Sequence, residues 1–408
     1  MIESSKVHKI LYGGDYNPEQ WPEEIWKEDM RLFKLAHIDV VTLNVFSWAA
    51  LQPDEITYDF SKLDKIIIGF VDGDGIGPVI MRAARKVLDE ILAEDVAQGR
   101  IEMRTIEGLT LENRAAKMET LPDDVLDQIK QCHVFLKGPT TTPNETMNMP
   151  NLESANVALR RELDLFANVR PISIPEKGID WTFYRENTEG EYIVGSRGVD
   201  VSDDLCIDFK VTTTQGTERI ARMAFEFARA NGKNRVECVT KANIVKKTDG
   251  RFLDVVHKVG EEYPDIRVED WYIDIMTANL INEDLQRDFQ VFVLPNLYGD
   301  IITDEAAQIQ GGMGTAGSAN IGSQYAMFEA VHGSAPRMVE EGIEDRANPE
   351  SLLKAAELML RHIGYAQKAE QLRRAVDSAA SDPSLRMTGT REGSSTDDFT
   401  EAVLKALN

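Results

Sequence analysis

Apolar and polar residues follow each other along this chain in two rhythms, one typical of buried strands and the other of amphipathic helices. The clearest strand–turn–helix unit starts at residue 65, where the run KIIIGFV precedes the turn DGDGIGP. Apolar side chains then recur at Val79, Ala83, Val87 and Ile91, the spacing of one buried helix face. Pro78 stands where a third glycine would complete GxGxxG, so the turn alone indicates only a tight connection.

Three later apolar runs are also predicted to be buried strands: residues 134–136, 236–240 and 291–294. The loop KGPTTTP follows the first run and suits either a stiff binding loop or a structural turn. Lys241 follows the second run, and a lysine at a strand end can act as an acid or base, although a single one is more often a solvated charge. Asp274 is predicted at the head of a helix within residues 270–280, where an N-cap role would also explain it.

Two aspartates follow the third run. Pro295 is expected to stop the strand, Gly299 to permit a tight turn, and residues 300–310 to form a helix. Asp300 and Asp304 then lie four residues apart on one face, where their charges repel unless a divalent cation binds them. The alternative is a solvated acidic face whose first aspartate is favoured by the helix dipole.

A second cluster suits anions. Ser154 and Asn156 are predicted at a helix start, where backbone N–H groups already attract negative charge. Arg160, Arg170 and Arg185 follow, and their planar guanidinium groups match carboxylates. Together these residues could clamp a small di- or tricarboxylate; ordinary ion pairs with the abundant acidic residues are the alternative.

The first 70 residues differ from the rest and hold three of the five tryptophans. Short strands at residues 10–13 and 39–45, with a helix at 23–37 between them, predict one β–α–β unit. A seam between this unit and the remainder is expected at residues 62–69.

Composition narrows the function classes. The 408-residue chain has a net charge of −24 and no stripe of Lys and Arg interleaved with aromatic residues, so we expect no nucleic-acid partner. No apolar run approaches the ~20 residues that span a bilayer, and the polar start is unlike a signal peptide. We therefore expect no membrane partner and a cytoplasmic protein of two or three domains. The three cysteines are far apart and odd in number, which predicts no disulfide framework.

The run YGGDYNPEQWPEEIWKEDMRLF and its continuation resemble the start of family 42 β-galactosidases, which are (β/α)8 barrels. The resemblance covers only residues 10–67, whereas such a barrel needs about 250 residues. The two catalytic carboxyl residues of that family come from later strands, which are missing, so Glu19 and Glu23 are interpreted as residues around a helix start. We treat residues 1–65 as a truncated glycoside-hydrolase-like segment and predict no β-galactosidase activity.

From about residue 66 onward, eight motifs resemble the isocitrate/isopropylmalate dehydrogenase family: GDGIGP, KGPTTTP, SANVALRRELDLFANVRP, RENTEGEY, KANI, DIMTANL, NLYGDIITD and MFEAVHGSAP. The resemblance implies a doubly wound α/β domain with a smaller α/β domain and an intersubunit clasp. Residues 66–160 and 325–408 would form the large lobe, and residues 161–324 the small lobe and clasp, with a candidate clasp strand at 206–214. A homodimer is implied, because each site in this family borrows residues from its neighbour.

The resemblance also implies a role for each motif. The substrate carboxylates would be held by Ser154, Asn156, Arg160, Arg170 and Arg185. Mg²⁺ or Mn²⁺ would be bound by Asp300 and Asp304 with Asp274 of the partner subunit. Protons would move through Tyr192 and Lys241 of the partner subunit. The dinucleotide would be contacted by Ile76, Thr142, His332, Gly333, Ser334, Ala335 and Asn348.

The implied reaction is the oxidative decarboxylation of a 2-hydroxy acid, most closely isocitrate to 2-oxoglutarate, with hydride transfer to NAD(P). Ser154 and Asn156 can hydrogen-bond a third carboxylate, which favours isocitrate. 3-Isopropylmalate and homoisocitrate are the alternative substrates. NAD is the expected coenzyme. NADP is kept as the alternative, because Arg337 stands where NAD-specific relatives often carry an aspartate. A non-catalytic regulatory subunit is the alternative from another functional class.

Overall fold

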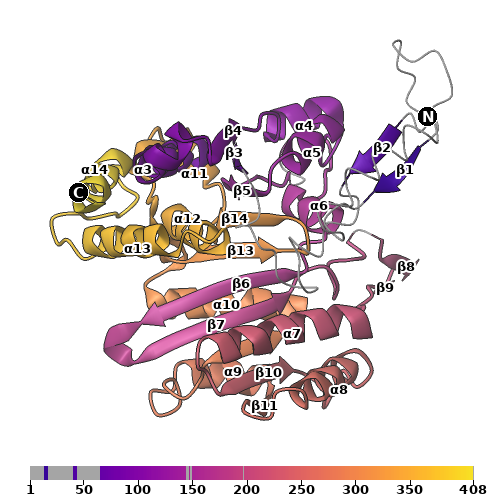
Figure 1. Ribbon diagram of the computed structural model, residues 1–408. Coiled ribbons are helices and arrows are strands. Elements are labelled where there is room, and N and C mark those ends of the chain that lie inside the picture. Colours follow the sequence, from indigo (N-terminus) through magenta and orange to yellow (C-terminus); the bar gives the residue numbers. More distant parts are fainter. Residues whose placement is uncertain are drawn as a thin grey trace, which may run out of the picture. The chain divides into compact units, whose positions relative to one another are not determined.

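The computed structural model describes residues 13–16, 40–43, 65–143, 147, 149–195 and 197–407 (Figure 1). Contacts divide the chain into two compact units, Met1–Leu63 and Asp64–Asn408. Each unit is described by itself. The boundary between the two units falls within the seam expected from the sequence.

The first unit contains two parallel strands, β1 (Gly13–Tyr16) and β2 (Val40–Leu43), paired from Gly13 with Val40 to Tyr16 with Leu43. Parallel pairing is what a β–α–β unit requires. The first strand was predicted at 10–13 and instead begins at Gly13. The predicted helix at 23–37, with Glu19 and Glu23, lies outside the described residues.

The second unit is built on one ten-stranded sheet of order β11-β10-β12-β7-β6-β13-β14-β5-β3-β4. Its strands are β3 (Ile66–Val71), β4 (Ile101–Thr105), β5 (Val134–Lys137), β6 (Ala167–Ile174), β7 (Ile179–Glu186), β10 (Arg235–Thr240), β11 (Arg267–Tyr272), β12 (Val291–Leu294), β13 (Gly317–Ile321) and β14 (Ala326–Ala330). The outer pairs are parallel, while β6 and β13 pair in antiparallel fashion with their neighbours. This mixed α/β architecture agrees with the predicted fold class.

Helices cover the sheet in two groups (Figure 1). The first group is α3 (Gly77–Ala97), α4 (Leu111–Lys117), α5 (Asp123–Lys130), α6 (Ala155–Glu162), α11 (Pro336–Glu340), α12 (Glu350–His362), α13 (Ala366–Ala380) and α14 (Thr396–Leu407). The second group is α7 (Thr214–Ala230), α8 (Thr248–Gly260), α9 (Ile273–Leu280) and α10 (Asn296–Gln310). Single 3-10 turns lie at Pro175–Lys177, Met313–Thr315 and Glu344–Arg346. Helices α3 and α14 contact each other although they are far apart in sequence. The predicted division into two lobes stays a prediction.

Two buried clusters hold the strands that carry the polar residues described below. In one, the rings of Phe183 and Phe292 stack with centroids 4.2 Å apart, and Trp181 meets Phe292 edge-on. In the other, Phe135 on β5 packs with Met327 on β14. Burying each of these side chains stabilises the fold by about 1.5–3 kcal/mol.

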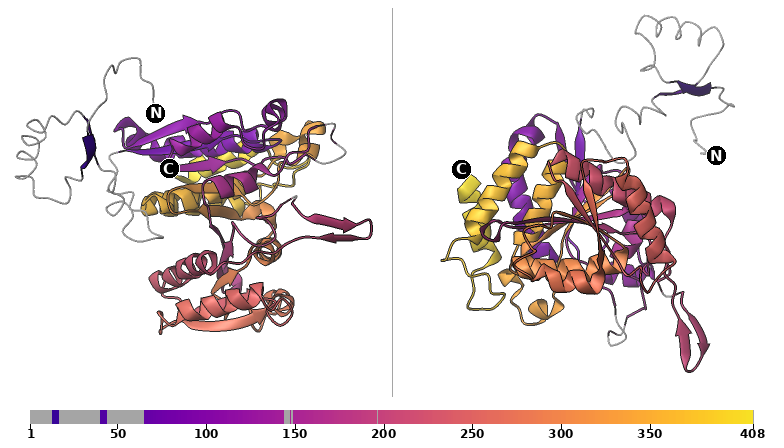
Figure 2. Two further views of the ribbon diagram at one scale, coloured as in Figure 1. Left: turned by 90° about the vertical axis from the view of Figure 1, so that its right-hand side faces the viewer. Right: turned by 90° about the horizontal axis from the view of Figure 1, so that it is seen from below.

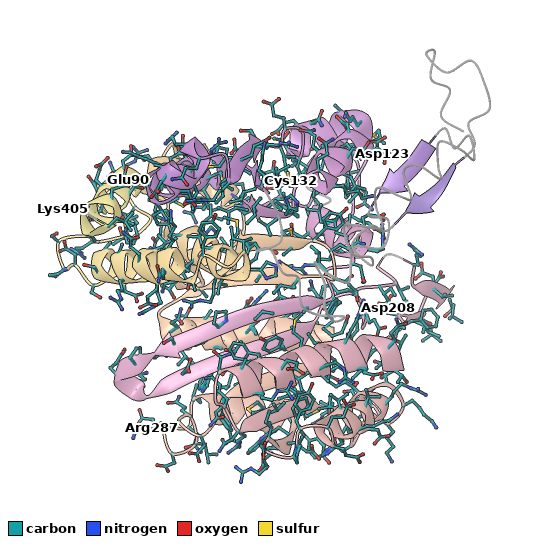
Figure 3. All side chains as sticks on the ribbon, viewed as in Figure 1. Glu90, Asp123, Cys132, Asp208, Arg287 and Lys405 are labelled. Carbon is teal, nitrogen blue, oxygen red and sulfur yellow. The ribbon has the colours of Figure 1, made fainter. Side chains whose placement is uncertain are left out.

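A two-stranded hairpin projects from the second unit as an arm (Figure 2). Its strands are β8 (Val199–Ser202) and β9 (Leu205–Ile207). Asp208, labelled in Figure 3, follows β9 directly. The clasp strand predicted at 206–214 is therefore shorter and earlier, because Thr214 already begins α7. Over the described part of the chain, no helix is both long and apolar enough to cross a bilayer.

Candidate active site

The two aspartates lie on α10, which begins four residues earlier than the sequence predicts. Pro295 is the N-cap, and Gly299 lies inside the helix instead of forming a turn, which corrects that prediction. A Cβ on Gly299 would stand 2.6 Å from Cγ of Arg185, so the glycine lets α10 approach β7 closely. This close approach brings Asp300 within reach of the arginine.

The predicted substrate-binding residues surround one cavity of about 300 Å³. Ser154, Asn156, Arg160, Arg170 and Arg185 all line it, together with Tyr192 and Asp300. Pro139, Thr140, Val157, Ser318, Glu329, Ala330, Val331, His332 and Gly333 complete the lining. The structure thus brings three arginines to one place in a strongly acidic chain, which favours a multiply charged anion.

Arg185 and Arg170 are almost completely buried and are held by polar neighbours. The Nε and Nη2 atoms of Arg185 donate to Oδ1 of Asn296 at 2.9 and 2.7 Å, and Nη1 donates to Asp300. Nη1 of Arg170 donates to Thr303 at 2.6 Å and to Asp304 at 3.0 Å. Both aspartates therefore face the arginines. No sequence pattern pointed to the supporting Asn296 and Thr303.

The third arginine, Arg160, lies 3.3 Å from Oε1 of the buried Glu329. Lys137, also buried, approaches the other oxygen of Glu329 at 3.0 Å, and Asn320 donates to Oε1 at 2.9 Å. Burial alone would raise the pKa of Glu329, but Lys137 and Arg160 outweigh it and lower that pKa to about 2. Sequence reasoning missed this pair, although a charged residue inside each of the apolar runs VFLK and AMFEA was a usable signal.

Tyr192 donates its hydroxyl hydrogen to Oδ2 of Asp300 at 2.6 Å. Burial, with this contact to Asp300, raises the pKa of Tyr192 to about 12. Burial pushes the pKa of Asp300 upward, but Arg185, Tyr192 and Arg170 hold it below its usual range. At neutral pH the tyrosine is therefore a proton donor and the aspartate an ionised acceptor.

Lys241 and Asp274 form an ion pair with each other. Asp274 is the second residue of α9, whose N-cap is Tyr272, so the N-cap interpretation of Asp274 is wrong. Within the described ranges, neither residue lines the cavity, and no group of three His, Cys, Asp or Glu side chains could hold a metal ion. Among the described residues, the carboxylates beside the cavity's arginines that could serve such an ion are the two of α10, hard oxygen donors suited to Mg²⁺ or Mn²⁺ but incomplete as a cage.

The predicted dinucleotide-binding residues come from loops that touch one another. The backbone N–H of Ile76 donates to the carbonyl of Ser334 at 3.0 Å, and the hydroxyls of Thr141 and Ser334 are 2.6 Å apart. Thr142, next in the chain, is exposed, and Ala335 adopts a left-handed backbone with φ of 44°.

His332 and Gly333 line the same cavity as the arginines. His332 lies 2.9 Å from the Gly333 carbonyl, and burial lowers the pKa of this histidine. Asn348 is placed differently, since its side chain accepts from the backbone N–H of Glu350, the first residue of α12. Asn348 is not part of the cavity lining. The loop of His332 lines the cavity and also contacts the glycine-rich turn through Ser334.

The sequence and the structure of this chain are both similar to those of known proteins. The sequence profile described as isocitrate/isopropylmalate dehydrogenase matches residues 67–403, and the profile described as beta-galactosidase matches residues 15–84. The NADP-dependent isocitrate dehydrogenase of Rickettsia prowazekii is 40% identical over 312 residues, 74% of this chain and 61% of that enzyme. Subunit 2 of the mitochondrial NAD-dependent isocitrate dehydrogenase of Saccharomyces cerevisiae is 36% identical, over 84% of this chain and 90% of that subunit. The crystal structure of isocitrate dehydrogenase from Methylococcus capsulatus superposes with a TM-score of 0.74 at 35% identity, covering 84% of this chain and 99% of that one.

Proposed function

This chain belongs to the isocitrate/isopropylmalate dehydrogenase family, and we propose that it oxidises and decarboxylates isocitrate to 2-oxoglutarate, transferring a hydride to NAD(P). The observation that carries the proposal is the single cavity in which three arginines meet the Tyr192–Asp300 pair and the loop of His332. A tricarboxylate substrate matches that charge, and the loop offers a neighbouring place for a nicotinamide.

The substrate would bind through its carboxylates. Arg170 and Arg185 are buried and pre-oriented by Asn168, Thr303 and Asn296, so little conformational freedom is lost when an anion arrives. Ser154 and Asn156 line the same cavity from the start of α6 and provide short polar groups for a third carboxylate. This polar end of the cavity supports isocitrate over a substrate with an isopropyl group.

A divalent cation would be held by Asp300 and Asp304 with Asp274 of the partner subunit. The donor set fits such an ion, because Asp300 is kept ionised and both carboxylates of α10 point to the same arginine. When bound, the ion would supply Lewis-acid chemistry at the substrate's 2-hydroxyl and carboxylate. Arg170 would then exchange its contacts with the aspartates for contacts with the substrate.

Proton transfers would fall to two side chains of this sequence. Lys241 of the partner subunit would accept the proton of the 2-hydroxyl as hydride leaves C2 for the nicotinamide. Loss of CO2 from the carboxylate of the resulting β-keto acid leaves an enolate, which takes up one proton at carbon. Tyr192, whose pKa is raised to about 12, keeps its proton near neutral pH and would deliver it to that enolate.

A homodimer is part of the proposal because one chain does not assemble these groups. Apolar side chains are exposed around Asp274 and Asp300: Tyr272, Ile275 and Ile301, at 44%, 49% and 58%. The hairpin exposes five more: Val199, Val201, Leu205, Ile207 and Phe209. Exposed apolar surface on two adjoining helices and on a projecting arm supports pairing with a second copy.

We favour NAD as the coenzyme. Arg337 would be the natural contact for the 2′-phosphate of NADP, but its guanidinium is engaged by Glu341 at 2.6 Å on an exposed turn of α11. Such exposed pairs are weak, so the preference for NAD is expected to be modest.

The proposal is tested by assaying the purified protein with isocitrate, Mg²⁺ and either NAD or NADP. We expect reduced nicotinamide with isocitrate, a loss of the signal on chelation of the metal, and a higher kcat/KM with NAD. 3-Isopropylmalate in place of isocitrate serves as the matched control substrate. Equal or greater turnover of 3-isopropylmalate, or no turnover of isocitrate with either coenzyme, would overturn the substrate assignment.

A further inference from the structure

The turn between β3 and α3 contains a buried carboxylate that the proposed chemistry does not use. Asp74 is 8% exposed, and its two oxygens bind to different segments of the chain. Oδ1 accepts from the backbone N–H of Leu111 at the start of α4, at 2.7 Å. Oδ2 accepts from the backbone N–H of Thr141 in the KGPTTTP loop, also at 2.7 Å. One side chain therefore ties together three segments distant in sequence.

Arg114 on α4 is the charged partner of this carboxylate. It is completely buried, lies 3.4 Å from Oδ2 of Asp74, and donates from Nη2 to the carbonyl of Thr141 at 2.6 Å. Within the described residues, its Nε and Nη1 atoms have no hydrogen-bond partner. A buried guanidinium with unsatisfied donors destabilises a fold compared with an apolar side chain of similar size. Burial accordingly lowers the pKa of Arg114, with Asp74 opposing that shift. A destabilising group in this place suggests a role other than stability.

The contacts of Thr141 show which loop Asp74 and Arg114 hold in place. Asp74 and Arg114 hold both the N–H and the carbonyl of this residue, which fixes its peptide groups. The Thr141 hydroxyl is 2.6 Å from the hydroxyl of Ser334 in the HGSAP loop. The glycine-rich turn is bonded to both of the other loops. The backbone N–H of Ile76 donates to the Ser334 carbonyl at 3.0 Å, and that of Asp74 donates to the Pro139 carbonyl at 2.7 Å.

The backbones of these loops approach one another closely at two glycines of the glycine-rich turn. A Cβ on Gly75 would stand 1.9 Å from the Ser334 carbonyl oxygen, and one on Gly73 would stand 2.2 Å from that of Pro139. Both glycines also have positive φ, which only glycine adopts without strain. The three loops therefore form one packed body, to which Arg114 of α4 is joined by its ion pair with Asp74.

We propose that Asp74 and Arg114 are positioning residues for the coenzyme: they lock the glycine-rich turn, the Thr141 loop and the Ser334 loop in the arrangement that binds the nicotinamide dinucleotide. The inference rests on the proposed function, since it assumes a dinucleotide on these loops. Neither residue is among the described residues that line the cavity of the arginines. Disturbing the pair should consequently weaken coenzyme binding and leave isocitrate binding nearly unchanged.

The test compares Asp74→Asn and Arg114→Met with Asp95→Asn. Asp95 on α3 is a matched control because it is also a buried, ion-paired carboxylate, held by Lys368 and Arg100 away from the three loops. For each protein, the Kd of NAD is measured directly by titration, followed by KM for isocitrate and the thermal midpoint. We expect Kd to rise roughly 10- to 100-fold in both loop variants, KM for isocitrate to stay within about twofold, and Asp95→Asn to lower only the midpoint. Arg114→Lys, which keeps the charge, should recover part of the affinity.

Two outcomes would overturn the inference: an unchanged Kd in the loop variants despite a lowered midpoint, or an equal loss of affinity in Asp95→Asn. If a loop variant does not fold, Thr141→Val removes only the hydroxyl contact to Ser334 and is expected to weaken NAD binding in the same direction. An unchanged Kd there would also count against the inference. If the unaltered protein binds neither NAD nor NADP, the proposed function fails and the inference with it; if it binds NAD but does not oxidise isocitrate, only the substrate assignment fails.

Discussion

Asp300 is the residue at which the proposed chemistry converges. One of its oxygens accepts from Arg185 and the other from Tyr192. These donors keep the carboxylate ionised in a half-buried place, and they are weaker partners for it than a divalent cation would be. The carboxylate of Asp300 can thus bind Arg185 in the absence of a metal ion and the metal ion when one is present.

Replacing Asp300 with Asn tests this assignment. The substitution keeps the size of the side chain and removes its charge, so we expect kcat/KM for isocitrate to fall at least about 100-fold with the thermal midpoint little changed. Asp288→Asn, at an exposed position before β12, is the matched control and should leave turnover unaltered. Full activity in Asp300→Asn would rule out the metal role.

Glu186 provides a prediction about pH and stability. Burial raises the pKa of this carboxyl to about 7, although Thr188 and Glu189 donate three hydrogen bonds to it. Its ordinary pKa is about 4.3, so between these values the folded protein binds more protons than the unfolded chain. The contribution of Glu186 to the free energy of unfolding is therefore expected to fall as pH rises from 5 to 7, by about 1 kcal/mol per pH unit. Urea unfolding at several pH values measures the slope, and Glu186→Gln should flatten it; an unchanged slope in that variant would show that the buried Glu186 is not its cause.

Side-chain type and spacing marked the aspartate pair and the three arginines as candidates, and the family resemblance then favoured a site over a charged surface. The structure places Asp300 and the three arginines around one cavity. The residues that orient them were not predicted. Asn296, Thr303 and Glu329 contact the arginines only because the order β12-β7-β6-β13-β14 brings distant strands together. No local pattern records a contact between residues more than a hundred positions apart.

Among the elements, α10 shows how a local rule can mislead. Gly299 follows a strand and a proline, a context typical of a turn, yet it lies within the helix. The reason is tertiary, because the glycine faces Arg185 and permits the contact between α10 and β7. The strands at 134–136, 236–240 and 291–294 were easier to predict, since a fully buried strand is apolar on both faces.

Gly299→Ala is therefore expected to be harmful. The added methyl would lie 2.6–2.7 Å from Cγ and Cβ of Arg185, and the helix or the arginine must move. We expect a loss of about 1–3 kcal/mol in the free energy of unfolding and a higher KM for isocitrate. Gly250→Ala in α8 is the control, because its Cβ would meet nothing within 4 Å and should raise stability by about 0.5–1 kcal/mol. If both substitutions stabilise the protein, the packing role of Gly299 is wrong.

The whole molecule combines a dehydrogenase-family unit with a segment, residues 15–84, that matches a beta-galactosidase profile. All residues with a proposed role lie in the second unit, Asp64–Asn408. Within that unit, Lys241 and Asp274 point to each other and not into the cavity, while apolar side chains near them are exposed. The sequence predicted a shared site only through its family resemblance, because no pattern in one chain shows which residues serve a second copy.

The central claim, an isocitrate dehydrogenase whose sites are completed across a dimer, is tested most directly by mixing two inactive variants. Lys241→Met and Asp300→Asn should each abolish turnover of isocitrate as homodimers. When the two are co-expressed, half of the dimers are mixed, and each mixed dimer contains one site with an intact Asp300 and an intact Lys241 from the partner. We predict recovery of about a quarter of the unaltered activity. No recovery, despite mixed dimers demonstrated by differential tags, would contradict a site shared between two copies of this chain.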